Sequence, residues 1–353
     1  MIMTFLMIGP ERMANMDTIL VTGGAGFIGS NFIRFLIGKY PEDRIINLDK
    51  LTYAGNLENL KGIVENEKYC FIKGDICDAE LINRIFNRYN PNFVVNFAAE
   101  SHVDRSILDP QVFIKTNVLG TQVLLDACRK VTTLYKYIQV STDEVYGSLG
   151  STGYFTEDTS LAPNSPYSAS KAGADMLVRA YYETFGLHVN ITRCSNNYGP
   201  YQFPEKLIPL FINNAQNNKE LPLYGDGLNI RDWLYVVDHC IAIDLVMRKG
   251  KSGEVYNIGG NNEKTNIEIT KCILSSLGRN ENLVRHVQDR LGHDRRYAID
   301  SSKIKKELKW EPLTCFEEGI KSTINWYIDN KRWLKNVISK EYLKYYEIMY
   351  TNK

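Results

Sequence analysis

A glycine loop near the N-terminus constrains the fold of this chain more than any other feature of its sequence. Residues 18–22 form an apolar, β-branched run that predicts a buried strand, and residues 27–39 predict a helix. Gly23, Gly26 and Gly29 connect the two, where glycine allows a tight turn and a close approach of the backbone to a pyrophosphate. The free N–H groups at the start of the predicted helix favour the same anion. This arrangement is typical of a dinucleotide-binding unit.

The residues after the next predicted strand bear on the choice of dinucleotide. This strand, at 44–48, ends in Asp49, twenty residues after Gly29. An acid at this position binds the ribose hydroxyls of NAD and repels the additional phosphate of NADP. Lys50 follows directly and argues for NADP. The sequence therefore favours NAD and leaves NADP open.

The composition bounds the partners of the chain. Among 353 residues, 42 Lys and Arg nearly balance 41 Asp and Glu, so no basic field would attract nucleic acid or an anionic membrane. Seven cysteines without a C-x-x-C pair are typical of reduced thiols in a cytoplasmic protein, and no metal site is expected. Residues 1–16 lack the features of a signal peptide or a membrane span, so we interpret them as an extension. The aromatic residues of the tail, 326–350, predict packing of a helical segment rather than nucleic-acid stacking.

Strands and helices alternate through the first half of the chain, which predicts an α/β fold with a doubly wound parallel sheet of the Rossmann type. Further strands are predicted at 70–73, 93–98, 137–140 and 189–193, and helices at 111–130 and 166–185. The turn-rich residues 196–200 mark the main domain change. A predicted helix at 236–248 and strand at 254–258 return the chain to the sheet. We expect an NAD-binding domain at 17–195, rejoined by about 236–260, and a smaller α/β substrate domain at 196–353.

The residues after the strand at 137–140 suggest proton chemistry. Tyr167 and Lys171 lie four residues apart and share one face of a predicted helix. A nearby ammonium favours the phenolate, which makes Tyr167 a candidate base toward a substrate hydroxyl, and Thr142 would hold that hydroxyl. Asp143 and Glu144 follow Thr142 directly. Since an alcohol oxidation needs one base, the adjacent carboxyl groups indicate that the oxidation prepares an elimination, with a solvated acidic turn as the alternative.

Long motifs carry a resemblance to a known family. They are VTGGAGFIGSNF, LDKLTYAGN, NFAAESHVDRSI, STDEVYG, SPYSASKAGAD, NNYGPYQFPEKLIPL, IRDWLYVVDH and GHDRRYAID. From Thr18 to about Tyr350 the chain resembles the extended short-chain dehydrogenase/reductase family, and within it the dTDP-glucose 4,6-dehydratases. The resemblance implies a cytoplasmic, NAD-dependent lyase that acts on dTDP-glucose, and a homodimer formed through helices 111–130 and 166–185.

The resemblance also implies a role for each catalytic side chain. Tyr167, with Lys171 and Thr142, takes the proton of the carbon-4 hydroxyl while hydride goes to NAD. Glu144 removes the proton on carbon 5, which the new ketone acidifies, and protonated Asp143 gives its proton to the departing carbon-6 hydroxyl. The hydride returns to carbon 6. Neighbouring carboxyl groups of different pKa suit an acid and a base.

The remaining site residues carry over from the same resemblance. Beside the three glycines, Tyr167 and Lys171, the residues expected to contact the cofactor are Phe27, Ile28, Asp49, Lys50, Thr52, Asp75, Ile76, Ala98, Ala99, Ser101, Thr116 and Asn197. Those expected to contact the substrate are Ser101, Thr142, Asn196, Lys206, Leu207, Pro222, Tyr224, Arg231, Asn266, His293 and Arg296. Arginine suits forked contacts to the diphosphate. His102 is interpreted as structural rather than as a general acid.

Two other function classes fit the same fold. A nucleotide-sugar epimerase or decarboxylase would need the ketone but has no use for both Asp143 and Glu144. A non-catalytic NAD-sensing module would need none of the catalytic side chains. Thymine and uracil differ by one methyl group, worth about 1–3 kcal/mol of discrimination, so the sequence leaves the base preference open.

Overall fold

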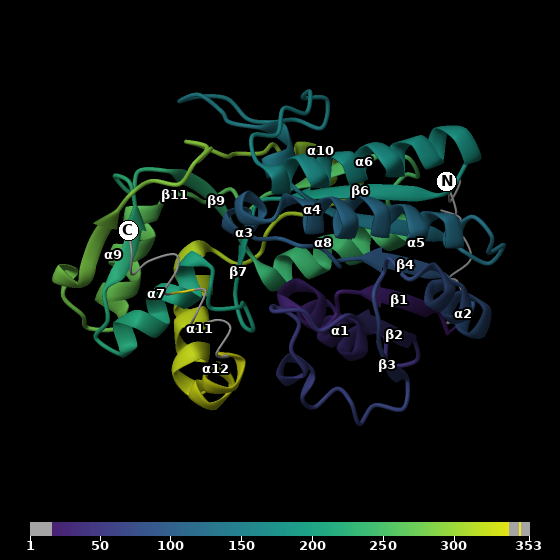
Figure 1. Ribbon diagram of the computed structural model, residues 1–353, viewed down its shortest axis with the longest axis horizontal. Coiled ribbons are helices and arrows are strands. Elements are labelled where there is room, and N and C mark those ends of the chain that lie inside the picture. Colours follow the sequence, from purple (N-terminus) through teal and green to yellow (C-terminus); the bar gives the residue numbers. More distant parts are fainter. Residues whose placement is uncertain (1–15, 339–345, 347–353) are drawn as a thin grey trace, which may run out of the picture.

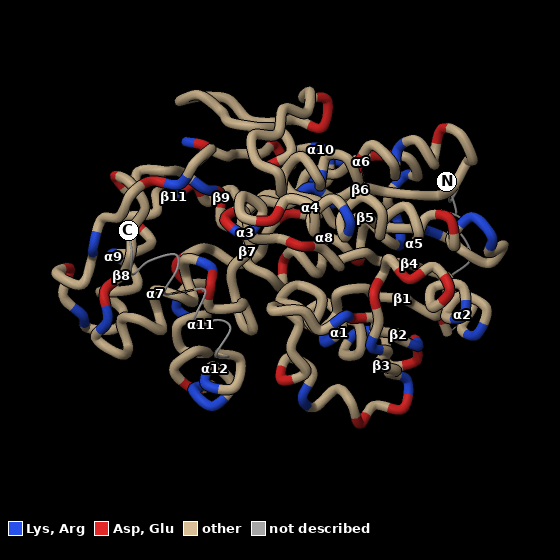
Figure 2. The backbone as a smooth tube through the Cα atoms, viewed as in Figure 1, with Lys and Arg blue, Asp and Glu red and all other residues tan. Residues whose placement is uncertain are grey.

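The computed structural model describes residues 16–338 and residue 346 as a larger and a smaller lobe (Figure 1). The extension expected at 1–16 lies outside the described residues except for Met16. No helix among the described residues is long and apolar enough to cross a membrane. Acidic and basic residues are interspersed along both lobes (Figure 2).

A seven-stranded parallel sheet forms the centre of the larger lobe, in the order β10-β6-β5-β4-β1-β2-β3. The strands are β1 (Thr18–Thr22), β2 (Arg44–Asp49), β3 (Tyr69–Lys73), β4 (Phe93–Asn96), β5 (Lys136–Thr142), β6 (Val189–Cys194) and β10 (Val255–Ile258). The strand order reverses at β1, which pairs with β2 on one side and β4 on the other. Ligands of such sheets bind at the carboxyl ends of the strands beside this reversal.

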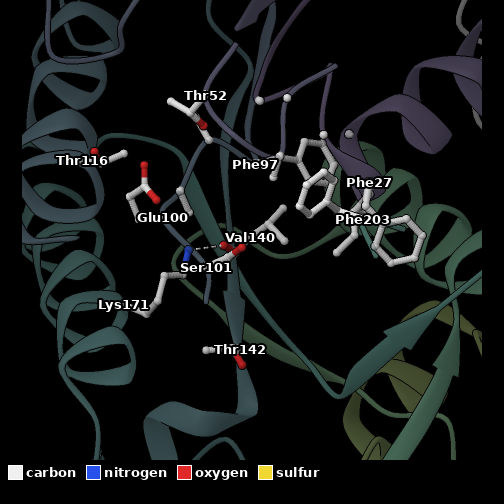
Figure 3. A pocket seen from close by; sticks show the side chains of 18 of the residues that line it. Phe27, Thr52, Phe97, Glu100, Ser101, Thr116, Val140, Thr142, Lys171 and Phe203 are labelled. Atoms are coloured by element: carbon white, nitrogen blue, oxygen red, sulfur yellow. Dashed lines mark hydrogen bonds between the residues drawn. The ribbon is translucent and has the colours of Figure 1, made fainter. Parts of the chain in front are cut away.

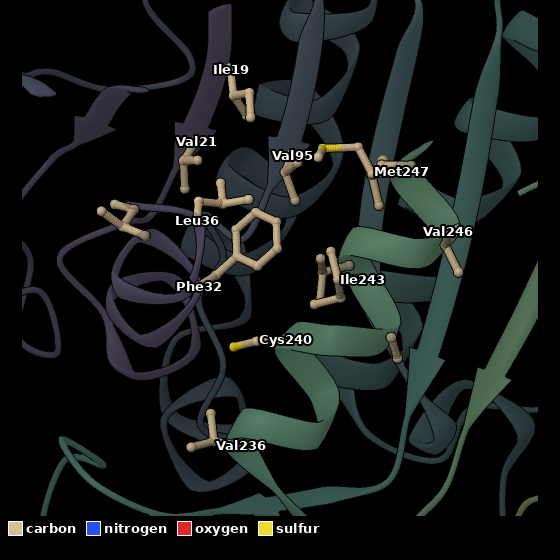
Figure 4. Close-up of a cluster of buried hydrophobic side chains, with 14 of the residues drawn as sticks. Ile19, Val21, Phe32, Leu36, Val95, Val236, Cys240, Ile243, Val246 and Met247 are labelled. Carbon is tan, nitrogen blue, oxygen red and sulfur yellow. The ribbon is translucent and has the colours of Figure 1, made fainter. Parts of the chain in front are cut away.

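Helices cover both faces of the sheet, so its strands are apolar on both sides. One face carries α1 (Phe27–Lys39), α8 (Val236–Lys249) and α10 (Ser302–Leu308), and the other α2 (Ala79–Tyr89), α5 (Gly120–Cys128) and α6 (Pro166–Phe185). Along β1, Ile19 and Val21 belong to the core under α1 and α8, whereas Leu20 belongs to the opposite core. Figure 4 shows Phe32 of α1 and Ile243 of α8 meeting in the first of these cores.

The helix predicted at 111–130 is interrupted. The chain forms α4 (Pro110–Phe113), then the π-helical turn η2 (Ile114–Leu119), then α5. Within η2, the Asn117 side chain bonds both backbone groups of Glu100, at 2.9 and 3.0 Å, and the Ser170 hydroxyl at 2.8 Å. The wide turn therefore places a buried amide between β4 and α6, a common use of π turns at functional sites.

The smaller lobe contains two short sheets and a separate core. A three-stranded sheet consists of β7 (Asn196–Tyr198), β9 (Ile230–Tyr235) and β11 (Glu263–Thr265), and a two-stranded sheet of β8 (Leu221–Tyr224) and β12 (Val284–Val287). The helices are α7 (Leu207–Gln216), α9 (Asn266–Ser276), α11 (Phe316–Asp329) and α12 (Lys331–Val337). Trp326, Tyr327 and Trp333 pack in this core, which confirms the packing role predicted for the aromatic tail as far as the described residues reach.

The chain passes between the lobes repeatedly. After β9 it enters α8, which packs against α1, and then β10, which pairs with β6 at the edge of the large sheet. Residues 236–249 therefore pack beside the large sheet, and residues 255–258 extend its edge. Short connecting elements complete the fold: η1 (Leu57–Leu60), α3 (Val103–Leu108), η3 (Asp143–Tyr146) and η4 (Glu281–Leu283).

Candidate active site

A cavity opens at the carboxyl ends of β1, β2, β4 and β5, where the doubly wound sheet predicts a ligand site. Its lining includes every residue that the sequence assigned to the cofactor, together with Thr142, Asp143 and Glu144. Figure 3 shows Phe27, Phe97 and Phe203 on one side of this cofactor cavity and Glu100, Thr116 and Lys171 on the other. Glu100 lies within the range 98–101 that the sequence assigned to the cofactor, whereas sequence reasoning did not identify Phe97 and Phe203.

The glycine loop leaves room for a diphosphate. Gly23 has φ 70°, and a Cβ atom there would lie 2.6 Å from the Ala98 nitrogen. A Cβ on Gly29 would overlap the carbonyl of Gly23. Gly26 caps α1 without a side chain, so the first N–H groups of the helix face the cavity unblocked. This cradle fits the pyrophosphate of a dinucleotide.

Two carboxylates near the glycine loop, those of Asp49 and Asp75, affect the choice between NAD and NADP as the cofactor. Asp49 accepts hydrogen bonds from the Ala25 nitrogen at 2.9 Å and the Leu51 nitrogen at 2.8 Å, and its side chain lines the cavity. Lys50 pairs with Asp75 at 2.8 Å. Because Lys50 is paired with Asp75, its ammonium is less available to an additional ribose phosphate, which weakens the sequence argument for NADP.

The catalytic candidates converge from β5 and α6. Thr142 is the last residue of β5, and Asp143 and Glu144 form the first turn of η3, where the Thr142 hydroxyl accepts a hydrogen bond from the Glu144 nitrogen at 3.3 Å. The helix α6 starts at a capping box with proline at its first turn, which fixes where Tyr167 and Lys171 enter the cavity.

The two adjacent carboxyl groups differ electrostatically. Burial raises the pKa of Asp143 well above its usual range, and the charges of Glu144 and Asp232 add to this effect. Its Oδ2 atom has no hydrogen-bond partner among the described residues, so this oxygen is available to a ligand in the cavity that Asp143 lines. Burial also raises the pKa of Glu144, but three cations, Arg290, Lys206 and Arg231, oppose that rise. Asp143 is therefore suited to act as an acid and Glu144 as a base.

The effect expected of Lys171 on Tyr167 is not supported. Burial, followed by the charge of Glu144, raises the pKa of Tyr167 well above its usual range. Burial lowers the pKa of Lys171, whose amine donates a hydrogen bond to the Val140 carbonyl at 2.7 Å (Figure 3). Burial and the charge of Glu144 therefore favour the neutral phenol over the phenolate in this geometry.

A second cavity meets the first at Glu144, Asn196 and Lys206, which line both. It extends into the smaller lobe. Its lining includes most of the predicted substrate residues, namely Asn196, Lys206, Leu207, Pro222, Tyr224, Arg231, Asn266 and His293, whereas Ser101 and Thr142 line the cofactor cavity. His102 also lines it, and burial lowers its pKa well below the usual range, which supports the structural interpretation of this histidine.

Arg296 is the substrate candidate that the structure places elsewhere. Its guanidinium binds both carboxylate oxygens of Glu263, at 2.6 and 2.9 Å, and the described lining of neither cavity includes it. Arg290 lines the second cavity instead, with Nε 3.8 Å from an Asp104 carboxylate oxygen. Sequence reasoning missed Arg290, although its place three residues before His293 was the available signal.

The fold and these cavities define an NAD-dependent enzyme of the extended short-chain dehydrogenase/reductase class. The family model for GDP-mannose 4,6 dehydratase matches residues 20–323. The chain is 52% identical over 344 residues to a dTDP-glucose 4,6-dehydratase of Xanthomonas campestris pv. campestris, covering 93% of this chain and 97% of that protein. It is 50% identical over 359 residues to one of Salmonella typhimurium, covering 95% and 99%.

Solved structures give the same result. The dTDP-glucose 4,6-dehydratase of Bacillus anthracis in complex with NAD superposes with a TM-score of 0.86 at 54% identity, covering 91% of this chain and 100% of that chain. DesIV of Streptomyces venezuelae, a dTDP-glucose 4,6-dehydratase, gives 0.88 at 51% identity, covering 91% and 100%. A UDP-glucose 4-epimerase of Thermotoga maritima gives 0.83 at 33%, covering 89% and 99%. The chain belongs to the dTDP-glucose 4,6-dehydratase family.

Proposed function

We propose that this protein is a lyase that converts dTDP-glucose to dTDP-4-dehydro-6-deoxy-glucose and water. The observation that carries the proposal is the pair of adjacent carboxyl groups of Asp143, which is buried, and Glu144, which is half-buried. Burial favours the protonated form of Asp143, whereas three nearby cations oppose the rise in the pKa of Glu144. The pair lies beside Tyr167 in the cofactor cavity. An epimerase needs no such pair.

Residues of the cofactor cavity would hold NAD. The glycine loop and the N-terminus of α1 would bind the pyrophosphate, and Asp49 the adenosine ribose. When bound, NAD takes hydride from carbon 4 of the sugar and returns it to carbon 6. Thr142 would orient the carbon-4 hydroxyl, and Tyr167, as the phenolate, would accept its proton. Because burial raises the pKa of Tyr167, we expect this proton transfer to become faster as the pH rises.

The elimination uses the two carboxyl groups. The carbon-4 ketone acidifies the proton on carbon 5, which Glu144 removes as the carboxylate. Asp143 gives its proton to the carbon-6 hydroxyl, which leaves as water. Glu144, now protonated, returns a proton to carbon 5 as the carbon-5 to carbon-6 double bond is reduced, which restores its carboxylate. Tyr167 then holds one proton more and Asp143 one proton fewer than at the start, so one proton must leave Tyr167 and one must return to Asp143, by exchange with solvent, before the next turnover.

The second cavity would bind the nucleotide diphosphate. Lys206 and Arg231 supply positive charge near Glu144, and Arg290 adds a third cation. Leu207, Pro222, Tyr224, Asn266 and His293 form the more distant part of the lining, suited to a base and its sugar. The dehydratase relatives support thymidine as the nucleoside. We assign the nucleotide region to residues 196–353 and the NAD region to 17–195 with 236–260.

We also propose a homodimer in the cytoplasm. Ile114 and Leu119 of η2 and Met176 of α6 expose 52%, 46% and 49% of their surface, on the two helical stretches expected to form a helix bundle. Ile114 and Leu119 also line one open surface hollow together with Leu177 of α6, and exposed apolar residues gathered in this way are typical of an interface. All seven cysteines are unpaired, as in a reducing compartment.

Isotope labels test the reaction. Deuterium at carbon 4 of dTDP-glucose should be recovered at carbon 6 of the product, and carbon 5 should acquire deuterium from heavy water. Mass spectrometry and NMR read both labels, with UDP-glucose and GDP-mannose as parallel substrates. Net release of reduced cofactor with the carbon-6 hydroxyl intact would contradict the proposal. Inversion at carbon 4 with that hydroxyl retained would make the protein an epimerase.

A further inference from the structure

Two consecutive hydrogen bonds connect the C-terminal helix α12 to the glycine loop. The indole Nε1 of Trp333 donates to Asn59 Oδ1 at 2.8 Å, and the Nδ2 of Asn59 donates to the carbonyl of Ala25 at 2.8 Å. Asn59 lies in η1 and is 2% exposed, and Trp333 is 7% exposed. The described lining of the cofactor cavity includes neither side chain. A contact at the end of the described chain thus reaches the loop that would bind the pyrophosphate.

The peptide groups around Ala25 are fixed from two directions. The Ala25 nitrogen donates to Asp49 at 2.9 Å, and the Ala25 carbonyl accepts a second hydrogen bond from the Asn56 nitrogen at 3.0 Å. Ala25 lies directly before Gly26, the cap of α1. The direction of the free N–H groups at the helix start therefore depends on how firmly Asn59 holds this carbonyl.

The same C-terminal helices also hold the opposite wall of the cavity. The Tyr327 hydroxyl of α11 donates to the carbonyl of Gln202 at 2.7 Å, and Trp326 packs on Tyr201 with ring centroids 4.7 Å apart. Gln202 and the adjacent Phe203 line the cofactor cavity. Figure 1 shows α11 and α12 in yellow, on the part of the smaller lobe that faces α1.

We propose that Trp333 and Asn59 are positioning residues for NAD, through which docked α12 holds the glycine loop in its binding conformation. The proposal rests on the function proposed above, since NAD is the ligand concerned. Neither residue touches the reacting atoms. If docking of α12 strengthens NAD binding, then bound NAD must stabilise docked α12 by the same factor, because the two equilibria are linked.

The first test measures retention of NAD. Trp333→Phe keeps an aromatic ring and removes the indole donor, leaving Asn59 Oδ1 without this partner. A net hydrogen bond is worth enough to raise the dissociation rate of NAD by about 2–10-fold, measured by trapping released cofactor. Asn336→Ala is the matched control, because Asn336 lies on the same helix but bonds the half-buried Glu58 at 3.0 Å rather than Asn59. A wild-type dissociation rate in Trp333→Phe would overturn the proposal.

The second test needs no substitution and decides the question if Trp333→Phe does not fold. Amide hydrogen exchange of the wild-type protein is followed with and without saturating NAD. Residues 331–337 should exchange more slowly with NAD, by the factor by which docked α12 strengthens the equilibrium binding of NAD. Slower exchange confined to the cavity lining would refute the positioning role. If NAD slowed amide exchange in no part of the chain, NAD would not bind, and this result would contradict the proposed function itself.

Discussion

Replacing Glu144 by glutamine should separate the oxidation from the elimination. The amide preserves the volume of this half-buried side chain but cannot act as the base. Thr142 and Tyr167 are unchanged, so carbon 4 can still be oxidised. Elimination should slow by about 10²–10⁴-fold, the usual worth of a positioned base, which is about 3–5 kcal/mol on the barrier. In addition, Asp143 loses the second cause of its raised pKa, although burial, the first cause, remains.

The assay follows two signals after rapid mixing with dTDP-glucose. Absorbance of the reduced cofactor should rise and persist in Glu144→Gln, while uptake of solvent deuterium at carbon 5 should be nearly lost. Asp143→Asn is the matched control, because it keeps the base and removes the acid: carbon 5 should still exchange while release of water slows. Exchange at carbon 5 at the wild-type rate in Glu144→Gln would refute the assignment of the base.

Three further outcomes are expected. Arg248 bonds Asp17, Asp43 and Asp244 at 2.7–3.2 Å. Replacing it in Arg248→Met should therefore lower the free energy of unfolding, measured by urea titration, by about 3–5 kcal/mol. An unchanged urea midpoint would contradict a structural role for this network. Because burial raises the pKa of Glu144, the rate of elimination should fall as the pH drops through that raised pKa. Lys206→Met removes a cation that opposes the rise in this pKa, so the acid limb of the pH–rate profile should move to higher pH, not lower. Ile114→Glu places a charge on the proposed dimer face and should yield monomers in sedimentation experiments, whereas a persistent dimer would exclude that face.

The parts of the fold that follow local rules were predictable. The helix at 27–39 has the predicted limits because glycine precedes it and the chain turns after Lys39. The helix at 166–185 likewise begins at a proline and ends at Gly186 in the left-handed conformation. The π turn η2 was not predictable, since nothing in the apolar periodicity of 111–130 distinguishes one wide turn from the α-helix around it.

Pairing between distant residues accounts for the differences between the expected and the observed site. Arg296 and Arg290 belong to one loop, and Glu263 on β11, together with the Gly153 carbonyl, holds Arg296 away from the cavities. Lys50 argued for NADP in the sequence because its partner Asp75 lies twenty-five residues further along the chain. Desolvation of Tyr167 likewise depends on the whole cavity, not on the spacing to Lys171.

Because the chain passes between the lobes repeatedly, neither lobe corresponds to one continuous segment that could be expressed or exchanged on its own. A cut after Cys194 would release a fragment without α8 and β10, leaving β6 with an unpaired edge and α1 without its neighbour. Such a fragment exposes a strand edge that invites aggregation. Exchange of sugar specificity between relatives therefore requires grafting several separate loops at once, since no single crossover point transfers the smaller lobe intact.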